Sequence, residues 1–288
     1  MEKLNDQFSQ ILSNLQEKYG SIEQKRTESF EVLDVVSDKC PYKQCDGSGY
    51  IVLKNNLGEV KMAICNCRRD KELLTKFKFA KIPIDLQDCT VKEFRTDIYQ
   101  VEVNRMKAEF AKRVATEFTE NFHEFKDQGK GLYLYSKTTG SGKSSLAVSI
   151  ANDIIRRLDV NVLYISSANM LNELKNTFDN KNGIRELDIL NYFGNVEVLI
   201  IDDFGVEKAS DWSESIFTQI LEERMNYKKV TILTSNLSVE ELSGKYPAGR
   251  IQSRIEKITF PLAMPEESVR SILAAEENEG LFNKIFGM

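Results

Sequence analysis

Short apolar stretches alternate with stretches of helical periodicity through most of the chain. The apolar stretches predict buried strands at residues 132–135, 160–166, 196–203 and 229–236. Apolar residues at intervals of three and four predict helices at residues 98–128, 145–158, 168–178 and 210–226. This alternation predicts an α/β fold in which a parallel sheet is flanked by helices. Ligands of such sheets bind at the carboxyl ends of the strands, so the residues that follow each strand are the candidates for chemistry.

Paired cysteines flank a predicted β-hairpin in the first quarter of the chain. Its strands, residues 50–54 and 59–64, are joined by an Asn/Gly turn. Two cysteines precede the first strand and two follow the second: Cys40, Cys45, Cys65 and Cys67. Because a hairpin returns its ends to one place, the four thiolates can bind one Zn²⁺ in a structural site with no open position. The alternative is free buried thiols, which is the expectation for the isolated Cys89.

Two further segments surround this hairpin. Residues 1–35 carry apolar side chains at helical spacing, which predicts a helix that either packs against its own domain or docks on a partner protein. Residues 68–81 are locally basic with interleaved phenylalanines, and form either a solvated linker helix or a nucleic-acid contact. We expect the domain boundary within this segment, which gives domains of residues 1–78 and 79–288.

The loop after the strand at 132–135 has the pattern of a phosphate-binding loop. It ends in Gly-Lys-Ser, residues 142–144, and a helix follows. Backbone N–H groups at such a helix N-terminus bind phosphate, Lys143 reaches the terminal phosphates, and the Ser144 hydroxyl binds Mg²⁺. The residues expected to contact the nucleotide are Lys137, Thr138, Thr139, Gly140, Ser141, Gly142, Lys143, Ser144 and Ser145. Lys137 stands where the pattern has its first glycine, and is either a tolerated surface substitution or an extra positive charge near the phosphates.

Polar residues follow two of the other predicted strands. Asp202 and Asp203 end the strand at 196–203, and Asn236 ends the strand at 229–236. Asp202 suits the Mg²⁺ shell, and Asp203 is placed to orient or deprotonate an attacking water. Asn236 can hold that water or the γ-phosphate. The alternative for the two aspartates is capping of a loop.

Three arginines near the carboxyl end of the chain are further candidates. Arg250 and Arg254 lie four residues apart, so they share a helix face. One of them either reaches the nucleotide of a neighbouring subunit as an arginine finger or belongs to a surface salt-bridge helix. Arg270 is either a nucleotide sensor or a surface charge.

Composition excludes several other classes of protein. The chain has 288 residues, 41% of them hydrophobic and 29% charged, as in globular proteins. Its net charge of −5 provides no global basic field for nucleic acid or membrane. No stretch of about 18 apolar residues is present, and the first residues lack an apolar signal core, so we expect a cytoplasmic protein with no membrane partner.

These motifs as a set resemble the AAA+ ATPases of the DnaC/DnaI helicase-loader group. The resemblance rests on Gly140–Ser144, Leu199–Gly205, Leu233–Asn236 and Gly249–Arg254, with residues 82–94 similar to the start of that ATPase domain. The cysteine hairpin resembles the zinc-binding helicase-interaction domain of the DnaI-type loaders and their bacteriophage relatives. The resemblance therefore implies an AAA+ sheet preceded by a small helical and zinc-hairpin domain.

The resemblance also implies roles and partners. Lys143 and Ser144 would bind ATP and Mg²⁺, Asp202 and Asp203 would form the Walker B pair, Asn236 would be sensor 1, and Arg254 (or Arg250) would be the arginine finger. The partners would be a replicative hexameric helicase, single-stranded DNA, and further copies of the chain through AAA+ interfaces. Asp203 in place of glutamate would fit slow hydrolysis.

Three other functions remain as alternatives. An IstB-like transposition-helper ATPase would share only the ATPase half. A small-molecule kinase would need an acceptor site, which the sequence does not indicate. A nucleotide-gated adaptor would bind ATP with little hydrolysis.

Overall fold

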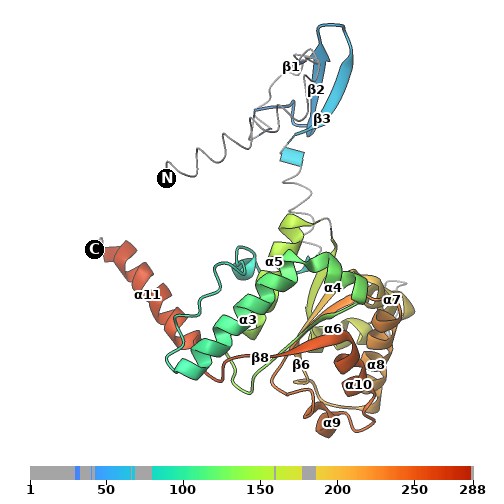
Figure 1. The fold of residues 1–288 in the computed structure, drawn as a ribbon, viewed down its shortest axis with the longest axis vertical. Coiled ribbons are helices and arrows are strands. Elements are labelled where there is room, and N and C mark those ends of the chain that lie inside the picture. The colour runs from blue at the N-terminus through green and yellow to red at the C-terminus, as the bar shows by residue number, and fades with distance from the viewer. Residues whose placement is uncertain are drawn as a thin grey trace, which may run out of the picture. The chain divides into compact units, whose positions relative to one another are not determined.

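The computed structural model describes residues 30–32, 40, 43–65, 67–68, 80–158, 160–176 and 186–286. The chain divides into two compact units, residues 1–72 and 73–288, and each is described by itself (Figure 1). The predicted boundary after residue 78 lies outside the described residues, as does most of the basic segment. The same holds for residues 1–29 and 33–35 of the predicted amino-terminal helix.

The amino-terminal unit contains a three-stranded antiparallel sheet. Its strands are β1 (Phe30–Val32), β2 (Tyr50–Asn55) and β3 (Val60–Ile64), in that order. The predicted hairpin is confirmed, and Asn55 closes its turn by accepting hydrogen bonds from the N–H groups of Leu57 and Glu59. The helix prediction for residues 1–35 is wrong at residues 30–32. There the Phe-Glu-Val stretch pairs with β2, because aromatic and β-branched residues suit a strand once a partner strand is available.

The second unit is built on a five-stranded parallel sheet. Its strands are β4 (Gly131–Tyr135), β5 (Val162–Ser166), β6 (Val198–Phe204), β7 (Val230–Ser235) and β8 (Thr259–Ala263). The order across the sheet is β5-β6-β7-β4-β8, and each neighbouring pair is parallel. The four predicted strands and the parallel sheet are confirmed, whereas β8 was not predicted.

Helices cover both faces of this sheet (Figure 1). One face is covered by α3 (Glu102–Glu120), α4 (Phe122–Gln128) and α5 (Lys143–Arg157). The other is covered by α6 (Ser167–Lys175), α7 (Glu186–Asn195), α8 (Asp211–Asn226), α9 (Leu242–Lys245) and α10 (Arg250–Ile258). The described residues also form η1 (Ile84–Leu86) and α11 (Arg270–Phe286). The helix predicted over 98–128 starts later and is interrupted at Asn121, whose ψ of 29° is not helical. Among the described residues, no helix combines the length and the apolarity needed to cross a bilayer.

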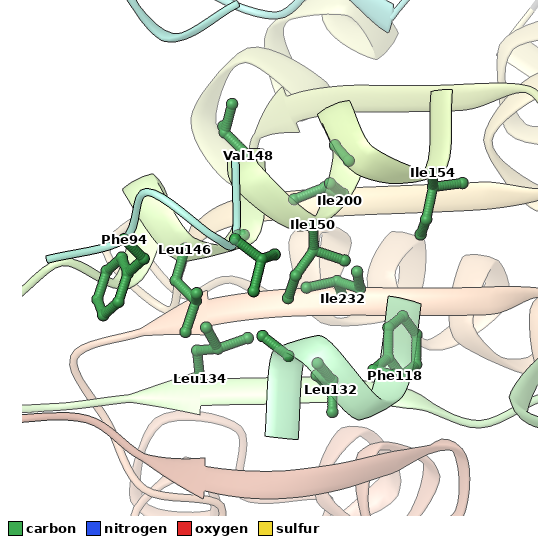
Figure 2. Packing of buried hydrophobic residues seen from close by; sticks show 14 of the residues in the cluster. Phe94, Phe118, Leu132, Leu134, Leu146, Val148, Ile150, Ile154, Ile200 and Ile232 are labelled. Atoms are coloured by element: carbon green, nitrogen blue, oxygen red, sulfur yellow. The ribbon is translucent and has the colours of Figure 1, made fainter. Parts of the chain in front are cut away.

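Side chains of the strands alternate between the two faces of the sheet. Leu132 and Leu134 pack with α3 and α5, whereas Tyr133 between them packs with α6, α7, α8 and α10. Figure 2 shows the apolar cluster on the side of the sheet that carries Leu132 and Leu134. In this cluster Ile200 and Ile232 lie beneath the apolar face of α5. Burial on both faces holds the strands in register, so their carboxyl ends lie at one edge of the sheet.

Candidate functional site

The phosphate loop, residues 136–145, joins β4 to α5 and needs glycine at two positions. Gly140 and Gly142 have φ angles of 77° and 91°, values that residues with a side chain rarely adopt. A Cβ atom on Gly142 would lie 2.7 Å from the Tyr99 hydroxyl and 3.3 Å from the Phe94 ring. Tyr99 also donates a 2.9 Å hydrogen bond to the Ser141 carbonyl oxygen. The segment before α3 therefore packs directly on the loop and fixes its second half.

Lys143 is buried in the first turn of α5. Its ammonium donates to the carbonyl oxygens of Ser136, at 3.1 Å, and Thr138, at 2.9 Å. Burial lowers the pKa of Lys143, and the negative charges of Asp203, Glu266 and Asp202 oppose this shift. The cation is thus held inside the loop, where the phosphates of a nucleotide are expected.

Three hydroxyl groups converge on the buried carboxylate of Asp202. Ser144 and Thr234 donate to its Oδ1 atom over 2.7 and 2.6 Å, and Tyr164 donates to Oδ2 over 2.5 Å. The contact between Ser144 and Asp202 brings together the two predicted magnesium ligands. Both offer the hard oxygen atoms that Mg²⁺ prefers, so these residues fit the ion.

Asp203 follows at the edge of the sheet and is exposed. Its φ of 52° turns the chain away from the strand direction, and its N–H donates to the Thr234 hydroxyl over 2.9 Å. Desolvation and then the Asp202 carboxylate raise the pKa of Asp203, whereas the charges of Lys143 and Arg270 lower it. The two aspartates therefore differ: Asp202 is buried and accepts three hydrogen bonds, whereas Asp203 is exposed.

Asn236 is half-buried and lies one residue beyond β7, at the same edge of the sheet as the phosphate loop and the aspartates. The Ser235 hydroxyl before it donates to the Phe204 carbonyl oxygen, which joins the ends of β7 and β6. The structure thus brings together the candidate residues of three different strands.

The three candidate arginines have different surroundings. Arg254 forms a 2.8 Å ion pair with Glu222 of α8 and its side chain is only 17% exposed, whereas Arg250 is exposed at the start of α10. Arg270 begins α11 beside the phosphate loop: its Cβ would lie 3.2 Å from a Cβ atom on Gly140. Arg254 is therefore tied to its own subunit, and Arg270 lies near the predicted nucleotide.

Sequence reasoning missed Thr234, Tyr164 and Tyr99 as residues of this site. Of these three residues, Thr234 is the one that the sequence could have identified, because it lies in the predicted strand that ends at Asn236. A hydroxyl two residues before a polar strand end lies on a predictable side of the strand. Tyr164 and Tyr99 come from segments with no motif, so only the folded chain identifies them.

The four cysteines of the amino-terminal unit form a buried cluster. Their Sγ atoms all lie within 4.8 Å of one another, with Cys40 and Cys65 3.7 Å apart and Cys45 and Cys67 3.5 Å apart. Four sulfurs bound to a tetrahedral zinc at about 2.3 Å lie roughly 3.8 Å from one another. The cluster is thus consistent with the predicted zinc site. Cys89 is half-buried and lies in the other unit.

The residues suggested for DNA contact are only partly described. Lys208 is exposed, but Trp212 packs partly buried against α6–α8, with the Lys175 ammonium 5.4 Å from its ring centre. The other suggested segment, residues 178–185 with Lys181 and Arg185, lies outside the described residues. Packing therefore accounts for the one tryptophan.

The parallel sheet and the phosphate loop beside an aspartate pair define an ATP-binding P-loop protein with an AAA+-like fold. The sequence profile described as "IstB-like ATP binding protein" matches residues 67–252. The chain belongs to this family.

Similar proteins include helicase loaders. Replicative helicase loader DnaC of Escherichia coli K12 is 30% identical over 169 residues, which cover 59% of this chain and 63% of DnaC. The Phage-like element PBSX protein XkdC of Bacillus subtilis is 28% identical over 202 residues, 68% of this chain and 71% of XkdC. The crystal structure of DnaI superposes with a TM-score of 0.52 at 28% identity, covering 64% of this chain and 94% of that structure. The predicted resemblance to DnaC/DnaI-type loaders is confirmed, although the match spans less than two thirds of the DnaC relatives.

Tyr164→Phe tests the hydroxyl cluster around Asp202. Removing one of three donors is expected to raise the Mg²⁺ concentration for half-maximal ATP hydrolysis about threefold to tenfold, because one hydrogen bond is worth about 1 kcal/mol. Turnover at saturating Mg²⁺ should fall by less than about twofold, since the other two donors still orient Asp202. Tyr227→Phe, an exposed tyrosine at the end of α8, is the control. A Mg²⁺ titration that is identical for both variants would contradict the assignment.

Proposed function

We propose that this chain is an ATP-dependent loader that places a replicative hexameric helicase on single-stranded DNA in the cytoplasm during replication initiation. The observation that carries the proposal is the contact of Ser144 with Asp202 beside Lys143, in a chain that is 30% identical to DnaC over 169 residues. The contact provides the parts for phosphoryl transfer, and the identity supports the loader role.

The residues of the site have separate tasks in ATP hydrolysis. The N–H groups of the phosphate loop and Lys143 bind the phosphates. Ser144 and Asp202 would hold Mg²⁺, which neutralises phosphate charge when bound. Asp203 takes a proton from the attacking water, and Asn236 orients that water or the γ-phosphate. A carboxylate shorter than glutamate at position 203 supports slow, switch-like hydrolysis.

An arginine from a second copy of the chain completes the site. Of the two candidates we favour Arg250, because it is exposed while Arg254 is paired with Glu222. An exposed guanidinium can reach a neighbouring phosphate without breaking an ion pair. Self-association through this surface would therefore be required for full hydrolysis.

The amino-terminal unit would bind the helicase. Its four cysteines would hold one Zn²⁺, which fixes a unit whose described residues form little apolar core besides the cysteines. Coupling this unit to the ATP site would release the helicase when ATP is hydrolysed. Lys208 and residues 178–185 stay proposals for contact with single-stranded DNA.

Helicase transfer onto circular single-stranded DNA tests the proposal. The full chain is mixed with the replicative helicase of its own cell or host, and helicase bound to the circle is counted after gel filtration. We expect ATP and the chain together to increase bound helicase at least about tenfold, and Lys143→Ala to abolish the increase. Failure of the chain to bind that helicase in any nucleotide state would refute the loader function.

An IstB-like transposition-helper ATPase remains the second candidate, since the matching family is described as IstB-like and ATP binding. It would bind ATP and DNA but not the helicase, so the same mixture separates the two. A nucleotide-gated adaptor would load the helicase with ATP but show little turnover.

A further inference from the structure

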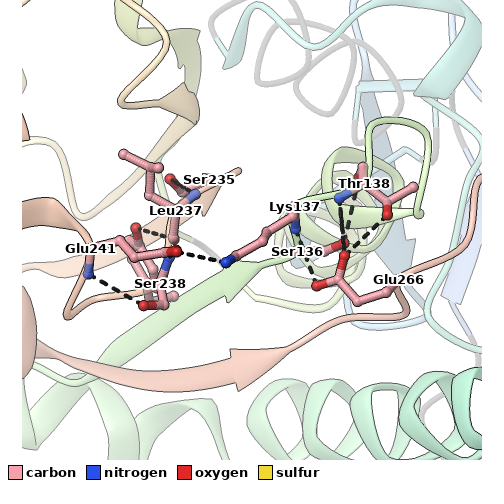
Figure 3. A network of polar contacts seen from close by, with 9 residues as sticks. Ser136, Lys137, Thr138, Ser235, Leu237, Ser238, Glu241 and Glu266 are labelled. Atoms are coloured by element: carbon pink, nitrogen blue, oxygen red, sulfur yellow. Dashed lines mark hydrogen bonds and ion pairs between the residues drawn. The ribbon is translucent and has the colours of Figure 1, made fainter.

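A single carboxylate holds the first half of the phosphate loop. Glu266, in the loop after β8, accepts hydrogen bonds from the N–H groups of Lys137 and Thr138, both at 3.1 Å (Figure 3). It also accepts from the Thr138 hydroxyl, at 3.0 Å, and shares the proton of the Ser136 hydroxyl, at 3.1 Å, with the Pro265 carbonyl oxygen, which lies 2.8 Å from that hydroxyl. Four donors from three consecutive residues thus meet one side chain. Desolvation raises the pKa of Glu266, but these hydrogen bonds together outweigh it and hold the pKa below its ordinary value.

These hydrogen bonds between Glu266 and residues 136–138, here called the Glu266 clasp, lie where the loop departs from the usual pattern. Lys137 replaces the first glycine, but it is absent from the described residues with positive φ, so its backbone does not need glycine. Its ammonium forms a 2.7 Å ion pair with Glu241 and points away from the loop (Figure 3). The lysine side chain is 74% exposed, and such pairs contribute little to stability. Glu266, which bonds the backbone itself, is therefore the stronger restraint on this half of the loop.

The clasp acts on the peptide groups that position Lys143. The carbonyl oxygens of Ser136 and Thr138 accept the hydrogen bonds of the Lys143 ammonium. Glu266 in turn accepts hydrogen bonds from the Ser136 hydroxyl and from the N–H group and hydroxyl of Thr138. Fixing these two residues fixes the acceptors of the cation. Loss of Glu266 would free the peptides to rotate, and Lys143 would lose its preorganised place.

Glu267, the next residue, provides a matched comparison. It accepts hydrogen bonds from the N–H groups of Gln100, at 2.7 Å, and Val101, at 3.1 Å, and from the side chain of Asn104. These groups form the N-terminus of α3. Two adjacent glutamates of one loop therefore brace different elements: Glu266 the phosphate loop, and Glu267 a helix end.

We infer that Glu266 is a positioning residue for nucleotide binding, which holds the first half of the phosphate loop in its binding conformation. The inference rests on the proposed function only in that the loop binds ATP. It assigns to this chain a restraint outside the glycine-lysine-serine motif. Its signature is a change in affinity with little change in turnover, because Glu266 contacts the loop and not the reacting water.

The affinity of the full chain for a fluorescent ATP analogue with Mg²⁺ tests this inference. Glu266→Ala is expected to raise Kd about tenfold, as expected for losing several charge-assisted hydrogen bonds at an exposed site, while kcat at saturation stays within about threefold. Glu267→Ala should raise Kd less than Glu266→Ala does, because Glu267 reaches the loop only through the segment that carries Tyr99. It should lower the melting temperature, since two backbone N–H groups lose their acceptor. An equal rise in Kd for both variants, or no rise for Glu266→Ala, overturns the inference.

Two further variants keep the result decisive. If Glu266→Ala does not fold, Glu266→Gln is judged by the same criterion. Its NH₂ group replaces one carboxylate oxygen and cannot accept the one hydrogen bond made to Oε1 or the three made to Oε2. Lys143→Ala reports on ATP binding itself. If this variant binds the analogue as tightly as the original chain, the proposed function fails. If it loses binding while the Glu266 variants keep theirs, only the role of Glu266 fails.

Discussion

Asp203→Asn is expected to reduce ATP turnover at least about a hundredfold, the scale of losing a positioned general base. Asp203 is exposed at the edge of the sheet, and its φ of 52° aims it away from the strand. Desolvation and the adjacent Asp202 raise its pKa, a direction that improves a carboxylate as a base near neutral pH. Asparagine has the same shape but cannot take a proton, so Kd for ATP should change by less than about threefold.

The control for this substitution is Asp211→Asn, at the exposed start of α8. It makes the same chemical change outside the nucleotide site and should leave turnover unaltered. Phosphate release is measured at saturating ATP and Mg²⁺ for both variants. Unchanged turnover in Asp203→Asn would remove the hydrolytic role of this residue and favour the nucleotide-gated adaptor.

Cys65→Ser is expected to abolish zinc binding and unfold the described part of the amino-terminal unit. The purified original chain should hold one zinc, and the variant less than about a tenth of that. Metal binding in such clusters supplies about 10–16 kcal/mol of folding free energy, more than a small unit can replace. Elemental analysis measures the zinc, and amide hydrogen exchange over β2 and β3 measures the loss of structure.

Cys89→Ser separates this effect from general loss of thiols. Cys89 lies outside the cluster, in the other unit, so this variant should keep its zinc. ATP turnover of Cys65→Ser should stay within about twofold of the original chain, because the substitution lies in a different compact unit from the nucleotide site. An original chain that purifies without zinc would contradict the assignment of the cluster.

The candidate site was predictable where its residues are neighbours in sequence. Gly140 to Ser144 form a contiguous loop whose glycines permit left-handed backbone, so the motif and the geometry coincide. The aspartates and Asn236 were predictable because strands in a parallel sheet end at one edge. The hydrogen bond of Ser144 to Asp202 agrees with this reasoning.

Long-range partners of these residues were not predictable. Tyr164 bonds Asp202 from the neighbouring strand β5, and Glu266 bonds the phosphate loop from a segment about 130 positions away. The pairing of Arg254 with Glu222 likewise depends on how α10 packs on α8. No local pattern specifies such contacts, since they require the relative placement of whole elements.

The missed strands have particular physical reasons. β8 contains Pro261, which lacks an N–H group and argues against a strand in sequence. It is tolerated because β8 is at the edge of the sheet and pairs only with β4. β1 spans three residues, too few to show a period, and it exists through its pairing with β2.

The sequence by itself determined the alternation of elements, the phosphate loop, the acidic strand end and the spacing of four cysteines. These depend on local backbone preference and on the periodicity of apolar residues, which are properties of short segments. Only the tertiary structure decided that Lys137 pairs with Glu241, that Arg250 is the exposed arginine of α10, and that Glu266 accepts hydrogen bonds from the phosphate loop. Those outcomes depend on which distant groups come within hydrogen-bonding distance, and packing of the whole domain sets that distance.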